Sequence, residues 1–171
     1  MPAPAEATAS YRLSVTAVGN SQTRWDAYFM ELARLVASKS KDTSTKVGTV
    51  IVGQGNTILS TGYNGFPRGV DEEVLPSRTD RPEKYFWTEH AERNAVYNAA
   101  LNGVKLCYSR AYSTSHPCVD CARALIQSGV MELMIPTKKN DPLFEAGGWE
   151  ENCAKARELL VAAGVVVSNA V

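Results

Sequence analysis

Four residues of the chain have types and spacings suited to metal chemistry: His90, Glu92, Cys118 and Cys121. Thiolates and imidazole are ligands that zinc prefers, and a catalytic zinc keeps three protein ligands and leaves its fourth position to water. One histidine and two cysteines supply three ligands of this kind. The pattern therefore predicts a catalytic zinc centre, with Glu92 left as a carboxylate that need not bind the ion.

The spacing of the two cysteines supports this interpretation. Cys118 and Cys121 are three residues apart, so on a helix they share one face and can bind one ion. Pro117 suits the first position of a helix, which places both cysteines in the first turn. The free N–H groups and the positive end of the helix dipole there favour the thiolate form. His90 must come from another element, because it lies 28 residues before Cys118.

Each motif alone has a simpler interpretation. A single Cys-x-x-Cys is often a redox motif or half of a structural zinc site, and a single His-x-Glu is often an ordinary helix surface. The chain has only two histidines and four cysteines, and three of these six residues fall in the pattern. Cys107 and Cys153 are interpreted as buried or free thiols. His116, beside Pro117, either lines the site or belongs to a loop.

Length and charge limit the possible functions. At 171 residues the chain predicts one domain at 20–171, preceded by a flexible tail at 1–19. Eighteen basic and eighteen acidic residues balance, so no overall field attracts nucleic acid or a membrane. No apolar stretch approaches the roughly 20 residues of a membrane span, and residues 1–10 lack the pattern of a secretory signal. Metal-spaced thiols without an export signal indicate the cytoplasm.

Hydrophobic periodicity predicts an α/β domain. Trp25, Phe29, Leu32 and Val36 form one stripe of a helix. The expected helices are 24–38, 88–101, 118–128 and 149–163, and the expected strands are 47–52, 58–62, 106–114, 130–135 and 165–167, with the first two strands forming a hairpin. This order predicts a three-layer α/β/α sandwich with a five-stranded mixed sheet. Both metal motifs precede or open a helix, where open α/β sheets place their sites.

Two further stretches accompany the metal motifs. Ser-Lys-Asp-Thr-Ser-Thr-Lys-Val-Gly occupies 40–48, and Thr-Gly-Tyr-Asn-Gly-Phe-Pro occupies 61–67. With His-Ala-Glu at 90–92 and Pro-Cys-Val-Asp-Cys at 117–121, the chain resembles the deoxycytidylate (dCMP) deaminases from about residue 25 to 164. The zinc motif alone indicates only the wider cytidine deaminase superfamily. The other two stretches narrow the resemblance to the deoxycytidylate branch and imply a cytidine deaminase-like fold.

The resemblance implies a reaction and a set of roles. The reaction is zinc-dependent hydrolytic deamination of dCMP to dUMP and ammonia, which supplies dUMP for thymidylate synthesis. The implied roles are Zn2+ binding by His90, Cys118 and Cys121, proton transfer by Glu92, and substrate contact by Asn64, Ala91 and Ser115. Asn64 also has a simpler interpretation, since Asn-Gly is a strong turn dipeptide.

The resemblance also implies partners. Members of the family form homo-oligomers, commonly hexamers, and some respond to dCTP and dTTP near the stretch at 61–67; Mg2+ would accompany such a nucleotide effector. The long connection at 64–84 supports an oligomer, because Phe66, Val70, Val74 and Leu75 have no evident local core. The implied partners are thus a small nucleotide and other copies of the chain, without nucleic acid or membrane.

Two departures from the family pattern concern substrate choice and allosteric control. The residues at 87–93 are bulkier and more charged than expected, and Glu89 with Arg93 predicts a surface ion pair. The stretch at 137–148 lacks a tyrosine of the family, and Phe144 and Trp149 are present instead. Five cations are candidates for a phosphate site: Lys41, Lys46, Arg68, Arg78 and Lys84.

Two alternative functions remain open at this stage. One is a zinc deaminase of another cytosine nucleoside, of a nucleobase or of guanine. The other is a non-enzymatic zinc module that uses the same scaffold for interaction. The second requires Glu92 to have no chemical role, and a purely structural zinc site would have a fourth Cys or His at ligand spacing.

Overall fold

The computed structural model describes residues 19–71, 79, 81–141 and 148–170. Its helices are α2 (Gly19–Ala37), α3 (Lys84–Trp87), α4 (Ala91–Leu101), α5 (Val119–Ser128) and α7 (Glu150–Ala162). Its strands are β1 (Gly48–Val52), β2 (Ile58–Tyr63), β3 (Ser109–Ser113), β4 (Val130–Ile135) and β5 (Val166–Asn169). Short 3-10 turns lie at Gln54–Asn56 and Lys138–Asn140.

The five strands form one mixed sheet in the order β2-β1-β3-β4-β5. β1 pairs with β2 and β3 in antiparallel register, whereas β3, β4 and β5 run parallel to one another. The predicted hairpin of the first two strands is therefore confirmed. The parallel half follows from α5 and α7, because each carries the chain back to the start of the next strand.

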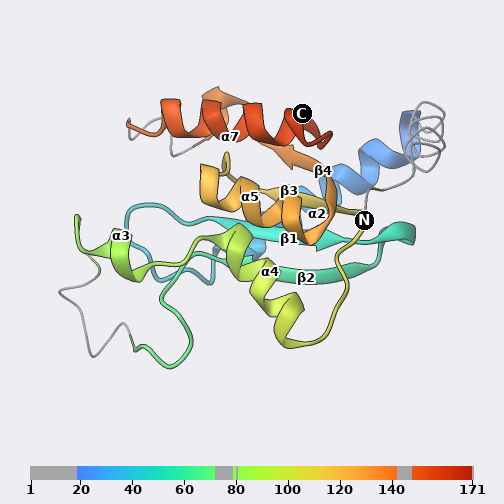
Figure 1. Ribbon diagram of the computed structural model, residues 1–171. Coiled ribbons are helices and arrows are strands. Elements are labelled where there is room, and N and C mark those ends of the chain that lie inside the picture. The colour runs from blue at the N-terminus through green and yellow to red at the C-terminus, as the bar shows by residue number, and fades with distance from the viewer. Residues whose placement is uncertain (1–18, 72–78, 80, 142–147, 171) are drawn as a thin grey trace.

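Helices cover both faces of the sheet, so the predicted α/β/α sandwich is confirmed. α2 packs on one face, where Phe29 and Met30 meet Val50, Val52 and Tyr112. α4, α5 and α7 cover the opposite face, as Figure 1 shows, around a larger apolar cluster. This arrangement places the N-termini of α4 and α5 side by side on one face, which is the arrangement that the site uses. None of the described helices is long and apolar enough to span a membrane.

α2 differs from the helix expected at 24–38. It begins at Gly19, five residues before the expected start. The residues before Trp25 are polar or glycine, so hydrophobic periodicity does not indicate this first part of the helix. Its buried face is rotated toward Met30 and Ala33, and Trp25 is 40% exposed. The expected tail at 1–19 falls outside the described residues, except for Gly19 itself.

Two glycines allow the helices to approach the hairpin closely. A Cβ atom at Gly48 would lie 2.2 Å from the carbonyl oxygen of Ala33 in α2. A Cβ atom at Gly62 would lie 2.3 Å from the backbone nitrogen of Ala95 and 2.4 Å from the carbonyl oxygen of Ala91 in α4. Any larger residue at Gly62 would therefore push away the helix turn that carries the metal motif.

Several predicted boundaries are wrong by a few residues. α4 begins at Ala91, not at residue 88, and α5 begins at Val119, not at Cys118. β3 covers only Ser109–Ser113 of the strand expected at 106–114, because its pairing with β1 ends there. α5 ends at Ser128, the predicted last residue, and the Gly129 that follows has a φ of 85°, a left-handed conformation that suits glycine.

Candidate metal centre and its pocket

The metal motifs lie at the starts of two neighbouring helices. His90 is the N-cap residue of α4, and Cys118 is the N-cap residue of α5, with Cys121 in the first turn. The expectation that Pro117 opens the helix is wrong, because Pro117 precedes the cap. The Cys118 sulfur accepts a hydrogen bond from the Cys121 backbone N–H at 3.5 Å, which takes the place of the usual oxygen cap.

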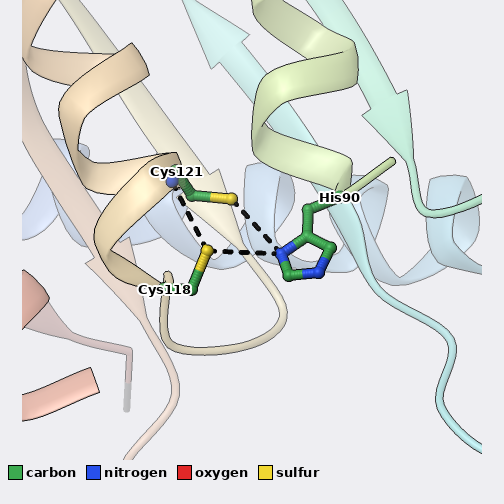
Figure 2. A group of neighbouring side chains, drawn as sticks. All are labelled: His90, Cys118 and Cys121. Carbon is green, nitrogen blue, oxygen red and sulfur yellow. Dashed lines mark hydrogen bonds between the residues drawn. The ribbon is translucent and has the colours of Figure 1, made fainter. Parts of the chain in front are cut away.

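His90, Cys118 and Cys121 converge on one point, although they come from two helices (Figure 2). The His90 Nδ1 atom lies 3.4 Å from the Cys118 sulfur and 3.5 Å from the Cys121 sulfur. Ordinary zinc–nitrogen and zinc–sulfur bond lengths in a tetrahedral site predict about 3.6 Å between such atoms. The three donors thus fit a zinc ion in both chemical type and spacing.

The charges of this group favour metal binding. Hydrogen bonds from the Cys121 thiol and from His90 lower the pKa of Cys118 to about 4, so Cys118 is a thiolate at neutral pH. The same thiolate raises the pKa of His90 by its hydrogen bond, and it raises the pKa of Cys121 well above the ordinary value. A thiolate at a helix N-terminus is the form of cysteine that binds metal.

Glu92 lies in the first turn of α4 and is 3% exposed. Its Oε1 atom lies 3.5 Å from the Ser113 hydroxyl, and the Cys121 side chain also hydrogen-bonds to it. Burial raises the pKa of Glu92, and the neighbouring His90 opposes that rise only in part. A buried carboxyl group with a raised pKa is suited to accept a proton in one step and to release it in another.

A single pocket joins the metal group to the residues expected to contact substrate. It is lined by His90, Glu92 and Cys118 together with Asn64, Ala91 and Ser115. Its other lining residues are Asp42, Thr45, Val47, Arg81, Lys84, Tyr85, Thr88, His116 and Trp149. All three expected contact residues therefore lie around the same cavity as three members of the predicted metal motif.

Asn64 is buried and is held by its surroundings. Its Oδ1 atom accepts from the Val47 backbone N–H at 2.8 Å, and its Nδ2 atom donates to the Thr45 carbonyl oxygen at 2.9 Å. The tight Asn-Gly turn is not formed. Instead, Gly65 exchanges two backbone hydrogen bonds with Glu89, which fastens the stretch at 61–67 to the residue before His90.

Asp42 and Lys84 form a partly buried ion pair in the wall of the pocket. We call these two residues, together with Arg81 and Tyr85, the outer part of the pocket. The Lys84 Nζ atom donates to both Asp42 carboxylate oxygens, at 3.1 and 2.9 Å, and to the Ser44 hydroxyl at 2.5 Å. Sequence reasoning proposed Lys84 only as a phosphate cation and gave Asp42 no role. The Ser-Lys-Asp stretch was the available signal for Asp42, whereas nothing in the sequence indicated the pairing.

Asp141 anchors the loop that precedes Cys118, a role that no sequence pattern indicates. Its carboxylate is fully buried and accepts from the Ser115 hydroxyl at 2.8 Å and from the His116 backbone N–H at 2.7 Å. It also pairs with the His116 ring nitrogen Nδ1 at 2.5 Å. His116 is a buried loop residue that also lines the pocket.

The remaining predicted residues lie outside the metal group. Glu89 and Arg93 form the expected ion pair, although both side chains are about four-fifths buried. Cys107 and Cys153 are free thiols, one exposed and one buried. Lys41, Lys46 and Arg68 are exposed and do not line the pocket. Val74, Leu75, Arg78 and Phe144 lie outside the described residues.

Comparisons with known proteins agree with this chemistry. Residues 23–137 match the model of the cytidine and deoxycytidylate deaminase zinc-binding region. The chain is 40% identical over 133 residues to a probable deoxycytidylate deaminase of Drosophila melanogaster, with 71% of this chain and 64% of that protein covered. It is 39% identical over 126 residues to the human deoxycytidylate deaminase, with 71% and 70% covered.

The fold also resembles a solved structure. The dCMP deaminase of the cyanophage S-TIM5 superposes with a TM-score of 0.64 at 25% identity, and the match covers 84% of this chain and 95% of that one. That enzyme has also been solved in complex with dCMP and dUMP, and the match has the same TM-score.

Proposed function

Because the chain belongs to the family of the cytidine and deoxycytidylate deaminase zinc-binding region, we propose that it converts dCMP and water to dUMP and ammonia. One observation carries the proposal. A buried carboxylate, Glu92, lies beside a His/Cys/Cys group that fits zinc and lines a pocket. The deoxycytidylate deaminases among the relatives support dCMP as the substrate.

The first part of the proposal concerns the ion. We assign His90, Cys118 and Cys121 as its ligands, because their donor atoms have the spacing and charge that zinc requires. When bound, zinc lowers the pKa of a water molecule so that the water becomes a nucleophile near neutral pH. Glu92 is not needed as a ligand and remains available for proton transfer.

Glu92 would carry the protons of the reaction in turn. It accepts a proton from the attacking water as the oxygen bonds to carbon 4 of cytosine, and it delivers that proton to ring nitrogen 3. It then takes the remaining proton from the new hydroxyl group and gives it to the amino group, which leaves as ammonia. One water is consumed and one ammonia released, so the carboxylate returns to its starting form.

The proposed substrate contacts have suitable groups to offer. Ala91 is fully buried, and its small side chain leaves room for a flat ring beside the metal group. The Ser115 hydroxyl donates a hydrogen bond to the Asp141 carboxylate, so the lone pairs of its oxygen can accept a hydrogen bond from the substrate. The side-chain amide oxygen of Asn64, Oδ1, accepts one hydrogen bond from the Val47 backbone N–H and has capacity for a second.

The proposal includes the cellular setting implied by the family resemblance. The chain would act as a cytoplasmic homo-oligomer, a hexamer by that resemblance, regulated by dCTP and dTTP with Mg2+ as the counter-ion of the effector. Large exposed apolar side chains on α3 and α4, namely Phe86 at 82% and Leu101 at 67% exposure, support association. Light scattering with and without dCTP, dTTP and Mg2+ tests this part, and a fully active, unresponsive monomer would contradict it.

A substrate screen tests the proposed reaction. Ammonia release would be measured for the zinc-loaded protein with dCMP, CMP, deoxycytidine, cytosine and guanine. We expect dCMP to give the highest kcat/KM, because a site built for a phosphate discriminates strongly against analogues that lack it. A higher kcat/KM for deoxycytidine, cytosine or guanine than for dCMP would mean that the chain is a zinc deaminase of another substrate. If none of the five compounds released ammonia, a non-enzymatic interaction module would be favoured.

A further inference from the structure

The outer part of the pocket contains two cations, Lys84 and Arg81, among the described residues that line it. A nucleotide differs from its nucleoside by a phosphate, which carries close to two negative charges at neutral pH. A protein that prefers the nucleotide must place cationic donors where that group lies. The question is therefore which of the two cations has donors available.

All the hydrogen-bond donors of Lys84 are already in use. An ammonium group has three N–H donors. In Lys84 they reach both carboxylate oxygens of Asp42 and the hydroxyl of Ser44, and the residue is only 7% exposed. Its charge is also neutralised by Asp42. Lys84 thus holds the pocket wall together and cannot turn to a phosphate without leaving a buried carboxylate unpaired.

Arg81 is in the opposite situation. Its side chain is exposed at the rim of the pocket, and its guanidinium carbon lies 5.9 Å from the centre of the Tyr85 ring. Among the described residues, no carboxylate forms an ion pair with Arg81, and the Tyr85 ring is its partner. A guanidinium stacked on an aromatic ring keeps its N–H edge available, and its planar fork matches two phosphate oxygens.

An aromatic wall connects Arg81 to the metal group. The Tyr85 ring lies 6.1 Å from the Trp149 ring, and Trp149 lies 6.0 Å from the His90 ring. All three aromatic residues line the pocket. A nucleotide whose base lies at the metal group would extend its sugar and phosphate along this wall toward Arg81.

We propose that Arg81, supported by the Tyr85 ring, binds the 5′-phosphate of the nucleotide and is the residue by which this chain prefers a nucleotide over a nucleoside. The inference rests on the proposed function, since it assumes that a cytosine nucleotide is turned over. Arg81 was absent from the five cations that the sequence suggested, because nothing in its local pattern shows that it meets the pocket.

The test compares Arg81→Ala with the wild type on two substrates, dCMP and deoxycytidine. Loss of a charge-assisted contact to phosphate should raise KM for dCMP and lower kcat/KM by about 10- to 100-fold. The kcat for dCMP should change little, because the contact is made equally in the ground state and the transition state. The kcat/KM for deoxycytidine should stay within about twofold, since that substrate has no phosphate.

Three further variants sharpen the result. Arg81→Lys should recover part of the loss, because it restores the charge without the planar fork. Arg34→Ala, which removes a cation from the exposed surface of α2, should leave both substrates unaffected. Lys84→Met should affect both substrates alike, because Lys84 supports the pocket wall and does not contact the phosphate.

The outcomes separate the inference from the proposed function. If the wild type releases ammonia from dCMP but Arg81→Ala is normal, or loses both substrates equally, then Arg81 is not the phosphate residue and the proposed function stands. If the wild type does not deaminate dCMP, the proposed function fails and this inference fails with it.

Discussion

The inner and outer parts of the pocket are built in different ways. The inner part is the metal group of His90, Cys118 and Cys121, of which His90 and Cys118 line the pocket, and all three lie at the starts of two adjacent helices. The outer part depends on Asp42 and Lys84, which are 42 residues apart in the chain and meet only through the fold. The proposed metal ligands are thus encoded in short local motifs, whereas the ion pair in the pocket wall depends on tertiary contacts.

The two parts also differ in how their polar groups are satisfied. In the inner part, the His90 Nδ1 atom lies 3.4 and 3.5 Å from the sulfur atoms of Cys118 and Cys121, a spacing that suits a shared zinc ion. In the outer part, the N–H donors of Lys84 already have hydrogen-bond acceptors, namely Asp42 and Ser44. Changes to the inner part should therefore act on metal content and turnover, and changes to the outer ion pair should act first on stability.

The largest effect is expected for Cys121→Ala. Two ligands hold a zinc ion far less firmly than three, so the variant should lose most of its zinc and its turnover should fall to background. Metal analysis after dialysis, together with ammonia release from dCMP, measures both. Cys107→Ser is the matched control, because Cys107 is an exposed free thiol and its loss should change neither quantity. A zinc-loaded, active Cys121→Ala would remove Cys121 from the metal centre.

The next largest effect is expected for Asp141→Ala. Asp141 does not line the pocket, but it accepts hydrogen bonds from Ser115 and His116 in the loop before Cys118. Loss of such a supporting partner typically weakens metal affinity or activity by about 10- to 100-fold. Competition with a chromophoric chelator gives the zinc affinity, and Glu158→Gln on the surface of α7 is the control. Unchanged zinc affinity in a folded Asp141→Ala would show that the loop holds its position without the carboxylate.

Lys84→Met should reduce turnover less than the two variants above, but it should clearly lower the free energy of unfolding. The substitution leaves Asp42 without its cation in a site where the side chain is only 11% exposed. The free energy of unfolding should fall by about 2–3 kcal/mol, with zinc content unchanged. Urea unfolding measures this change. Wild-type stability in Lys84→Met would mean that the ion pair contributes nothing to the outer part of the pocket.

The pH dependence of the stability difference between the wild type and Lys84→Met provides an internal control. Burial alone would raise the pKa of Asp42, but hydrogen bonds from Lys84, Ser44 and Thr45 hold it below its ordinary value of 3.8. The ionised pair therefore stabilises the fold above that value, and this contribution is lost as the pH falls through the lowered pKa. The stability gap between wild type and Lys84→Met should be full near pH 7 and should shrink below about pH 4.

The comparison also explains what could be predicted from the sequence. The metal residues were identifiable because each motif spans a few residues and its chemistry depends on spacing alone. The strands were identifiable from β-branched runs such as that of β1. The anchoring role of Asp141 was not, because a single aspartate in an irregular stretch gives no pattern. Arg81 was not, because it meets the pocket and the Tyr85 ring only through tertiary structure, which periodicity does not reveal.

The most direct test of the account is the zinc content and turnover of Glu92→Gln, measured on the same sample. Metal binding is proposed for His90, Cys118 and Cys121, and proton transfer for Glu92, so the two functions should separate in this variant. We expect about one zinc per chain, as in the wild type, with kcat for dCMP lower by about 10²- to 10⁴-fold or more. Turnover close to that of the wild type in the zinc-loaded variant would contradict the account, because Glu92 would then have no role in the reaction.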